Sequence, residues 1–216
     1  MENEAEAAQT FRDSDPLTLP ASNVTVLGAF NPAIIQPPWL SKVVFGARGD
    51  YEVLVAAAGG GPVLQRRNNI TWWVQPDRLV AASSPISLAA TFVKKVLETL
   101  HHTPVKAVGI NFRVEALLPL TGPWFSKLLD LRSSGEFLRG KMAVSVVLRA
   151  ARADNSAVNV TIQEAGLPQV SLDLNFHRSA VAQDEGDRVT ELIAHIDRAS
   201  SFEAEVATIK AEICHE

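Results

Sequence analysis

The sequence of 216 residues predicts an α+β fold: one antiparallel β-sheet made of two meanders, with helices packed on one of its faces. Two observations support this prediction. Strand-like segments are grouped in runs rather than alternating one by one with helices, which disfavours a doubly wound parallel sheet. Each run is followed by a segment with the 3.6-residue apolar period of a helix. The expected order is β-meander, helix, strand, helix, β-meander, helix, with six to nine strands and three to four helices.

The first meander begins where the segment NVTVLGAF alternates from Asn23 and is rich in β-branched residues. The proline-rich segment 32–38 predicts a loop or a sheet edge, because proline cannot donate a hydrogen bond to a central ladder. Further short strands are expected at residues 42–46, 51–57, 69–75 and 78–82. Glycines 59–61 and the Pro76-Asp77 pair mark turns between them.

A helix is predicted from Ser87 to the pair His101-His102, because its apolar residues recur at intervals of three and four. Pro104 disfavours helical geometry at the preceding residue and so ends the helix. The two histidines would then occupy the last helical turn, where a partial positive charge is favoured. Adjacent helical residues point about 100° apart, so both cannot bind one metal ion from a regular helix. A site role for either histidine remains the alternative.

The second half predicts a long strand at residues 105–117, a helix within 122–137 and a meander of three strands. The strands alternate strictly around residues 142–148, 158–162 and 170–176, as in a sheet that is packed on one face. The chain ends in helix, with a bend at Ser200 where a capping pattern starts.

The domain organisation follows from composition and charge. Residues 1–20 read as a disordered acidic leader and residues 21–216 as a single α+β domain; a domain built of two similar halves, 21–103 and 104–216, is the alternative. Residues 1–16 hold five acidic residues and one basic residue, and residues 184–216 hold nine and three. Since the whole chain carries −4, the body between them is mildly basic.

Several classes of function are disfavoured by composition. The single cysteine, Cys214, cannot form an internal disulfide or a cysteine-rich metal site, and the N-terminus lacks the apolar segment of a signal peptide. No segment has the roughly 20 apolar residues of a membrane-spanning helix. The basic residues are scattered, which argues against nucleic acid. We therefore expect a cytoplasmic protein without cofactor, metal, membrane or nucleic-acid partner.

The outward face of the second meander is the best candidate for a ligand site. If the hairpins keep their apolar faces together, Arg149, Asn159 and Asn175 fall side by side, with Thr161 and Asp173 one step along. Residues 111, 113 and 115 join them if the long strand is a neighbour. The candidate ligand-binding residues are Arg113, Arg149, Asn159, Asp173 and His177. The alternative is an ordinary solvated face.

Two adjacent tryptophans, Trp72 and Trp73, lie on one predicted strand and so must point to opposite faces. One can lie in the core, and the other is available to a helix, a loop or a partner; tryptophan is enriched in binding hot spots. The candidate interface residues are Trp39, Trp72, Trp73, Phe202, Val206, Ile209 and Ile213. For the C-terminal residues of this set, packing on the chain's own sheet is the favoured alternative.

The function predicted from these features is a non-catalytic interaction or assembly subunit of a cytoplasmic complex, bound to a protein partner or to copies of itself. No histidine pair has the spacing of a zinc-binding helix motif, and no nucleophile motif is present. The alternatives are a small-ligand binding protein that uses the helix-covered sheet as a cradle, and an enzyme, such as a hydrolase with His177 or His101 as base.

Overall fold

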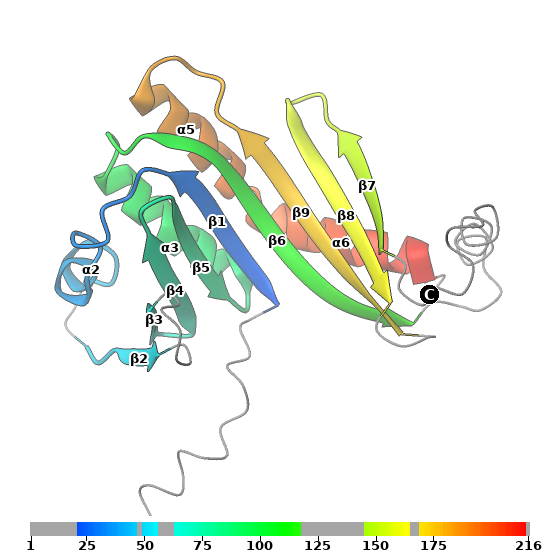
Figure 1. Cartoon of the computed structure of the whole chain (residues 1–216), viewed down its shortest axis with the longest axis horizontal. Helices are drawn as coiled ribbons and strands as arrows, with labels where there is room; N and C mark the ends of the chain where they lie inside the picture. The colour runs from blue at the N-terminus through cyan, green and yellow to red at the C-terminus, as the bar shows by residue number, and fades with distance from the viewer. Residues whose placement is uncertain (1–20, 47–48, 56–62, 118–144, 165–168, 215–216) are drawn as a thin grey trace, which may run out of the picture.

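The computed structural model describes residues 21–46, 49–55, 63–117, 145–164 and 169–214. They form one antiparallel sheet of nine strands, in the spatial order β2-β3-β4-β5-β1-β6-β9-β8-β7, together with four helices (Figure 1). The α+β prediction is therefore confirmed. The strands are β1 (Ser22–Gly28), β2 (Glu52–Val55), β3 (Val63–Arg67), β4 (Ile70–Gln75), β5 (Arg78–Ser83), β6 (Val105–Leu117), β7 (Ser145–Ala151), β8 (Ser156–Glu164) and β9 (Gln169–Ser179).

The strand order repeats one pattern on either side of the sheet centre. In the first half, β1 is followed by a meander whose last strand, β5, returns to pair with β1. In the second half, β6 is followed by a meander whose last strand, β9, returns to pair with β6. The two leading strands, β1 and β6, pair with each other at the centre. The halves thus share a topology, and the pairing of β1 with β6 joins them into one continuous sheet.

The described helices are α2 (Pro37–Val43), α3 (Ile86–Thr99), α5 (Glu185–Ile196) and α6 (Ala199–Cys214). Helices α3, α5 and α6 lie on the same side of the sheet, which we call the covered face (Figure 1). The core lies between them: Val24, Ile110 and Phe176 occupy neighbouring strands in one row and are fully or almost fully buried. Phe202 of α6 stacks on Phe176 with ring centroids 4.4 Å apart. None of the helices among the described residues is long and apolar enough to cross a membrane.

Two elements of the first half differ from the sequence prediction. The expected strand at 42–46 is wrong, because helix α2 occupies residues 37–43. Pro37 stands in the first turn of this helix, where its missing N–H has no helical partner to lose. Strand β3 was not expected, because the charged residues Arg66 and Arg67 obscure its alternation. A two-residue turn links it to β4: Asn68 and Asn69 adopt positive φ angles of 50° and 61°, which asparagine tolerates well.

The elements of the second half agree closely with the prediction. The long strand at 105–117 is β6, and the three alternating strands are β7, β8 and β9. The described apolar residues of β8 and β9 on the expected face, such as Ile162, Leu172 and Phe176, are buried, and the C-terminal helix divides into α5 and α6. The predicted helix within 122–137 and the leader at 1–20 lie outside the described residues.

The pair His101-His102 lies just beyond helix α3 rather than within its last turn. The helix ends at Thr99, and the backbone N–H of Leu100 donates to the carbonyl of Val96. Both histidines are exposed, with ring centroids 3.9 Å apart. The helix end is thus closed by its own backbone, and the predicted capping role of the histidines is wrong.

Candidate functional site

The face of the sheet opposite the three helices, which we call the outer face, carries a row of asparagines. Asn23 on β1 lies opposite Asn111 on β6, which lies opposite Asn175 on β9, which lies opposite Asn159 on β8. Arg149 on the edge strand β7 continues the row. We call the four asparagines the amide row. The register places Arg149, Asn159 and Asn175 side by side, as the sequence predicts.

Side-chain hydrogen bonds connect the amide row in one direction. Nδ2 of Asn159 donates to Oδ1 of Asn175 (3.3 Å), Nδ2 of Asn175 to Oδ1 of Asn111, and Nδ2 of Asn111 to Oδ1 of Asn23 (2.8 Å). The hydroxyl of Thr25 also donates to Oδ1 of Asn23 (3.0 Å). Each of these amides can make about four hydrogen bonds, so Asn175 retains an N–H and a lone pair. Asn111 retains a lone pair, while its second N–H donates to the Thr25 hydroxyl (3.5 Å). All four are half-buried, which leaves these groups accessible from the outer face.

Gly109 makes room for the amide row. It lies on β6, two residues before Asn111 and on the same face. A Cβ atom at this position would approach Nδ2 of Asn175 to 2.6 Å, closer than atoms can pack. The absent side chain therefore lets the Asn175 amide reach across to Asn111. Sequence reasoning missed Gly109, although a glycine inside a strand often marks such a close approach.

An ion pair lies beside the amide row. Nε of Arg113 donates to Oδ1 of Asp173 (2.6 Å) and Nη2 to Oδ2 (3.1 Å), across the β6–β9 pair. The hydrogen bond with Asp173 raises the pKa of Arg113. Thr161 follows on β8 opposite Asp173, as expected from the sequence. Because the Arg113 side chain is 62% exposed, the pair is a surface feature and contributes little to stability.

His177 completes the set of predicted ligand-binding residues on the outer face. It lies opposite Gly109 and Ala157, and its Nε2 is 3.1 Å from the hydroxyl of Ser179. Burial lowers the pKa of His177, and the nearby charge of Arg149 lowers it further, so the surroundings favour the neutral ring. The hydrogen bonds found within the described ranges give this ring no carboxylate partner. The serine–histidine contact thus lacks the third group that orients a catalytic base.

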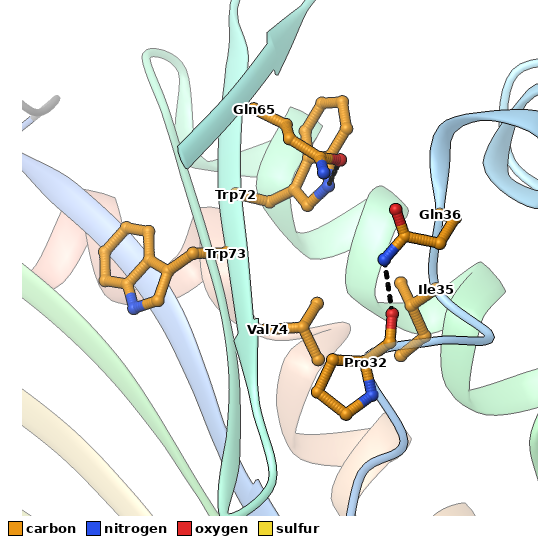
Figure 2. A pocket seen from close by; sticks show the side chains of 7 residues that line it. All are labelled: Pro32, Ile35, Gln36, Gln65, Trp72, Trp73 and Val74. Atoms are coloured by element: carbon orange, nitrogen blue, oxygen red, sulfur yellow. Dashed lines mark hydrogen bonds between the residues drawn. The ribbon is translucent and has the colours of Figure 1, made fainter. Parts of the chain in front are cut away.

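The predicted interface residues are distributed over different surroundings. Trp72 and Trp73 point to opposite faces, as predicted (Figure 2). Trp72 is 1% exposed, Phe202 is 0% and Val206 is 6%, so these three belong to the chain's own core and offer almost no surface to a partner. Trp39 and Ile209 are partly buried against this core. Trp73 is half-buried on the outer face, and the side chain of Ile213 lies outside the described part.

A pocket of about 180 Å³ lies on the other side of β4 from the Trp73 ring (Figure 2). It is lined by Pro32, Ile35, Gln36, Gln65, Trp72, Trp73 and Val74. None of the predicted ligand-binding residues contributes to it. The residues that the structure describes contain no group of three or more histidine, cysteine or acidic side chains that could hold a metal ion.

No protein-family model matches the chain, and no curated protein matches its sequence. The functional reading therefore depends on the geometry alone.

Proposed function

We propose that the protein is a non-catalytic interaction subunit that binds a protein partner through the outer face of its sheet. The observation that carries the proposal is the amide row. From Asn23 to Asn159 it crosses three strand spacings, roughly 14 Å at about 4.8 Å each, and Arg149 on β7 extends the polar surface by one more strand. A row of this length with regularly repeated donors and acceptors suits a macromolecular surface better than a compact small molecule, which binds in a concave site.

The charges of the outer face favour a protein over a polyanion. Arg113 is paired with Asp173, and Arg66 lies 3.9 Å from Glu52 on the same face. Nucleic-acid binding depends on cations that neutralise several phosphates, and paired arginines serve this poorly. Neutral amides together with partly exposed aromatic and aliphatic side chains are common in protein interfaces. Here these apolar side chains are Trp73 and Val147, which is 65% exposed.

The proposal includes a cytoplasmic location. The single cysteine supports it, because a chain with one cysteine cannot form the internal disulfides that are common in proteins of oxidising compartments. The partner is either a different protein or a second copy of this chain. The two cases differ in the mass of the complex, which the experiment below measures.

The test compares the wild-type chain with Gly109→Ala. The added methyl group displaces the Asn175 amide and breaks the amide row, while the fold is retained because the displaced group is the end of a flexible side chain. Ser201→Ala is the matched control, since this residue is exposed on α6 behind the covered face. Each tagged protein is purified from its native host with and without nuclease, co-purifying proteins are quantified, and the mass of the complex is determined by light scattering.

We expect a stoichiometric protein partner, or a defined homo-oligomer, that survives nuclease and is reduced at least about tenfold by Gly109→Ala but not by Ser201→Ala. A wild-type monomer without any bound protein would contradict the proposal. So would a partner that Gly109→Ala retains in full, because the amide row would then take no part in binding. Loss of the partner after nuclease treatment would assign the outer face to nucleic acid instead.

A further inference from the structure

The pocket beside β4 lies at a point where the sheet divides. Strand β4 pairs with β5 as far as Gln75, but it pairs with β3 only from Ile70 to Trp72. Strand β3 itself continues with β2 as far as Val63. In the described register, therefore, the last part of β4 is not paired with β3. The loop that contains Pro32, Ile35 and Gln36 faces this gap across the pocket (Figure 2).

The direction of the backbone groups in β4 follows from its two-residue turn. Residues that flank such a turn form a hydrogen-bonded pair. The backbone N–H and C=O groups of Ile70 therefore point towards β3. By alternation, the N–H and C=O groups of Trp72 and Val74 also point to the β3 side, and those of Trp73 point to β5. Trp72 is paired with Gln65 of β3, whereas Val74 is paired with no residue of β3. The described register therefore gives the Val74 backbone no partner in β3, although Val74 lies opposite Leu79 of β5.

The polar side chains of the pocket are also only partly satisfied. Oε1 of Gln65 accepts a hydrogen bond from the Trp72 indole N–H (3.1 Å), and Nε2 of Gln36 donates to the Pro32 carbonyl (2.6 Å). The Nε2 of Gln65 and the Oε1 of Gln36 form no further hydrogen bond within the described residues. The pocket thus offers donors and acceptors but no charge, since none of its seven lining residues is ionisable.

The size and the lining of the pocket define what it can hold. Its volume of about 180 Å³ is below the ~300–1,000 Å³ of sites for drug-sized molecules. It is slightly larger than an apolar cavity of about 150 Å³ that holds benzene. Ile35, Trp72 and Val74 give it apolar walls. A leucine side chain or a phenyl ring therefore fits. The uncharged backbone N–H and C=O groups of Val74 can pair with those of a peptide backbone.

We infer that this pocket is a binding site for an extended peptide segment with an apolar side chain. The peptide backbone pairs with the N–H and C=O of Val74, as in the addition of a strand to an open sheet edge, and its side chain enters the pocket. This site is separate from the outer face and does not depend on the function proposed for that face.

The test titrates the full chain with two minimal probes, N-acetyl-phenylalanine N-methylamide and N-acetyl-leucine N-methylamide. The glycine analogue is the matched control, because it has the same backbone and no side chain. Binding is followed by ¹H–¹⁵N NMR at the Val74 amide and the Trp72 indole N–H. We expect saturable shifts at both groups, with a Kd on the order of 1 mM, as is reasonable for ligands of this size. The glycine analogue should bind at least about tenfold more weakly.

Two variants separate the backbone contact from the side-chain contact. Val74→Pro and Val74→Ala both replace the isopropyl side chain, but only proline removes the N–H. Proline is tolerated here because this N–H points away from β5. We expect the phenylalanine probe to bind Val74→Pro several-fold more weakly than Val74→Ala, as monitored at the Trp72 indole.

The absence of saturable shifts in the wild-type chain, or equal affinity for the glycine analogue, would overturn the inference. Equal affinity of the two variants would overturn the backbone pairing. If Val74→Pro does not fold, the wild-type titration with the three probes decides the question.

Discussion

The two faces of the same sheet differ sharply although their residues alternate along the same strands. On the covered face, Val24, Ile110 and Phe176 are buried under helices. Their neighbours in sequence belong to the amide row and lie on the outer face. Asn23 precedes Val24, Asn175 precedes Phe176, and Asn111 follows Ile110. The covered face consists of apolar side chains that stabilise the fold by leaving water. The outer face carries half-buried amides and an exposed ion pair, and it is the face to which we propose that a partner binds. In this proposal, the same strands contribute one face to the core and the other to the contact surface.

The adjacent tryptophans provide the largest expected difference between the faces. Trp72 packs against Phe92, with ring centroids 5.1 Å apart, and its indole N–H is bonded to Gln65. Trp72→Ala should lower the free energy of unfolding by about 3–5 kcal/mol, because it leaves a large cavity. Trp73→Ala should lower it by much less, since the Trp73 ring is only half-buried, while weakening the binding of a partner. Urea denaturation and the pull-down described above measure the two effects.

Equal destabilisation by the two tryptophan substitutions would show that the outer face also forms part of the core. Unchanged association of a folded Trp73→Ala protein would remove Trp73 from the proposed contact surface.

Two ion pairs give a smaller difference. Glu191 of α5 binds Arg178 of β9 (2.7 Å) and also accepts backbone N–H groups of Val181 and Ala182; both charged side chains are about four-fifths buried. Its removal leaves several donors unpaired, so Glu191→Ala should cost about 1–3 kcal/mol of unfolding free energy. Asp173→Ala on the outer face should cost about 0–1 kcal/mol, because its partner Arg113 is well exposed.

Chemical denaturation at pH 7 compares these two variants under the same conditions. A loss for Asp173→Ala as large as that for Glu191→Ala would contradict the assignment of the ion pair on the outer face to a surface role.

Two histidines give the smallest difference, which depends on pH. Burial lowers the pKa of His195 below 6.5; its Nε2 lies 3.2 Å from the Phe176 carbonyl, and Nδ1 has no partner within the described residues. The charges of Arg198 and Arg178 lower this pKa further, while Asp154 acts in the opposite direction. Since the unfolded chain takes up the proton first, the contribution of His195 to stability is full above pH 6.5 and is lost as the pH falls below it. His177 shifts in the same direction but is more accessible.

Urea unfolding between pH 7.5 and 5 should therefore show a decline of at most about 1.4 kcal/mol per pH unit for each histidine. His195→Gln should remove more of this decline than His177→Gln. An unchanged pH dependence in His195→Gln would mean that the buried ring does not control it.

Alternation along each strand was sufficient to predict which residues share a face. It placed Arg149, Asn159 and Asn175 in one row, because hairpins that keep their apolar faces together allow few registers. Helix α2 and strand β3 escaped prediction for local reasons. Pro37 and Pro38 were interpreted as a loop although proline is well suited to a first helical turn, and the arginines of β3 weaken its apolar pattern.

The sequence by itself determined the fold class, the long central strand and the division of residues between a covered and an outer face, since these depend on periodicity along the chain. Only the tertiary structure decided that β1 lies beside β6, so that Asn23 completes the amide row from 88 residues away and Gly109 leaves space for Asn175. It also decided that β3 separates from β4 and opens the pocket at Val74. Contacts between distant strands depend on how helices and sheet pack together, and local periodicity carries no information about which strands become neighbours.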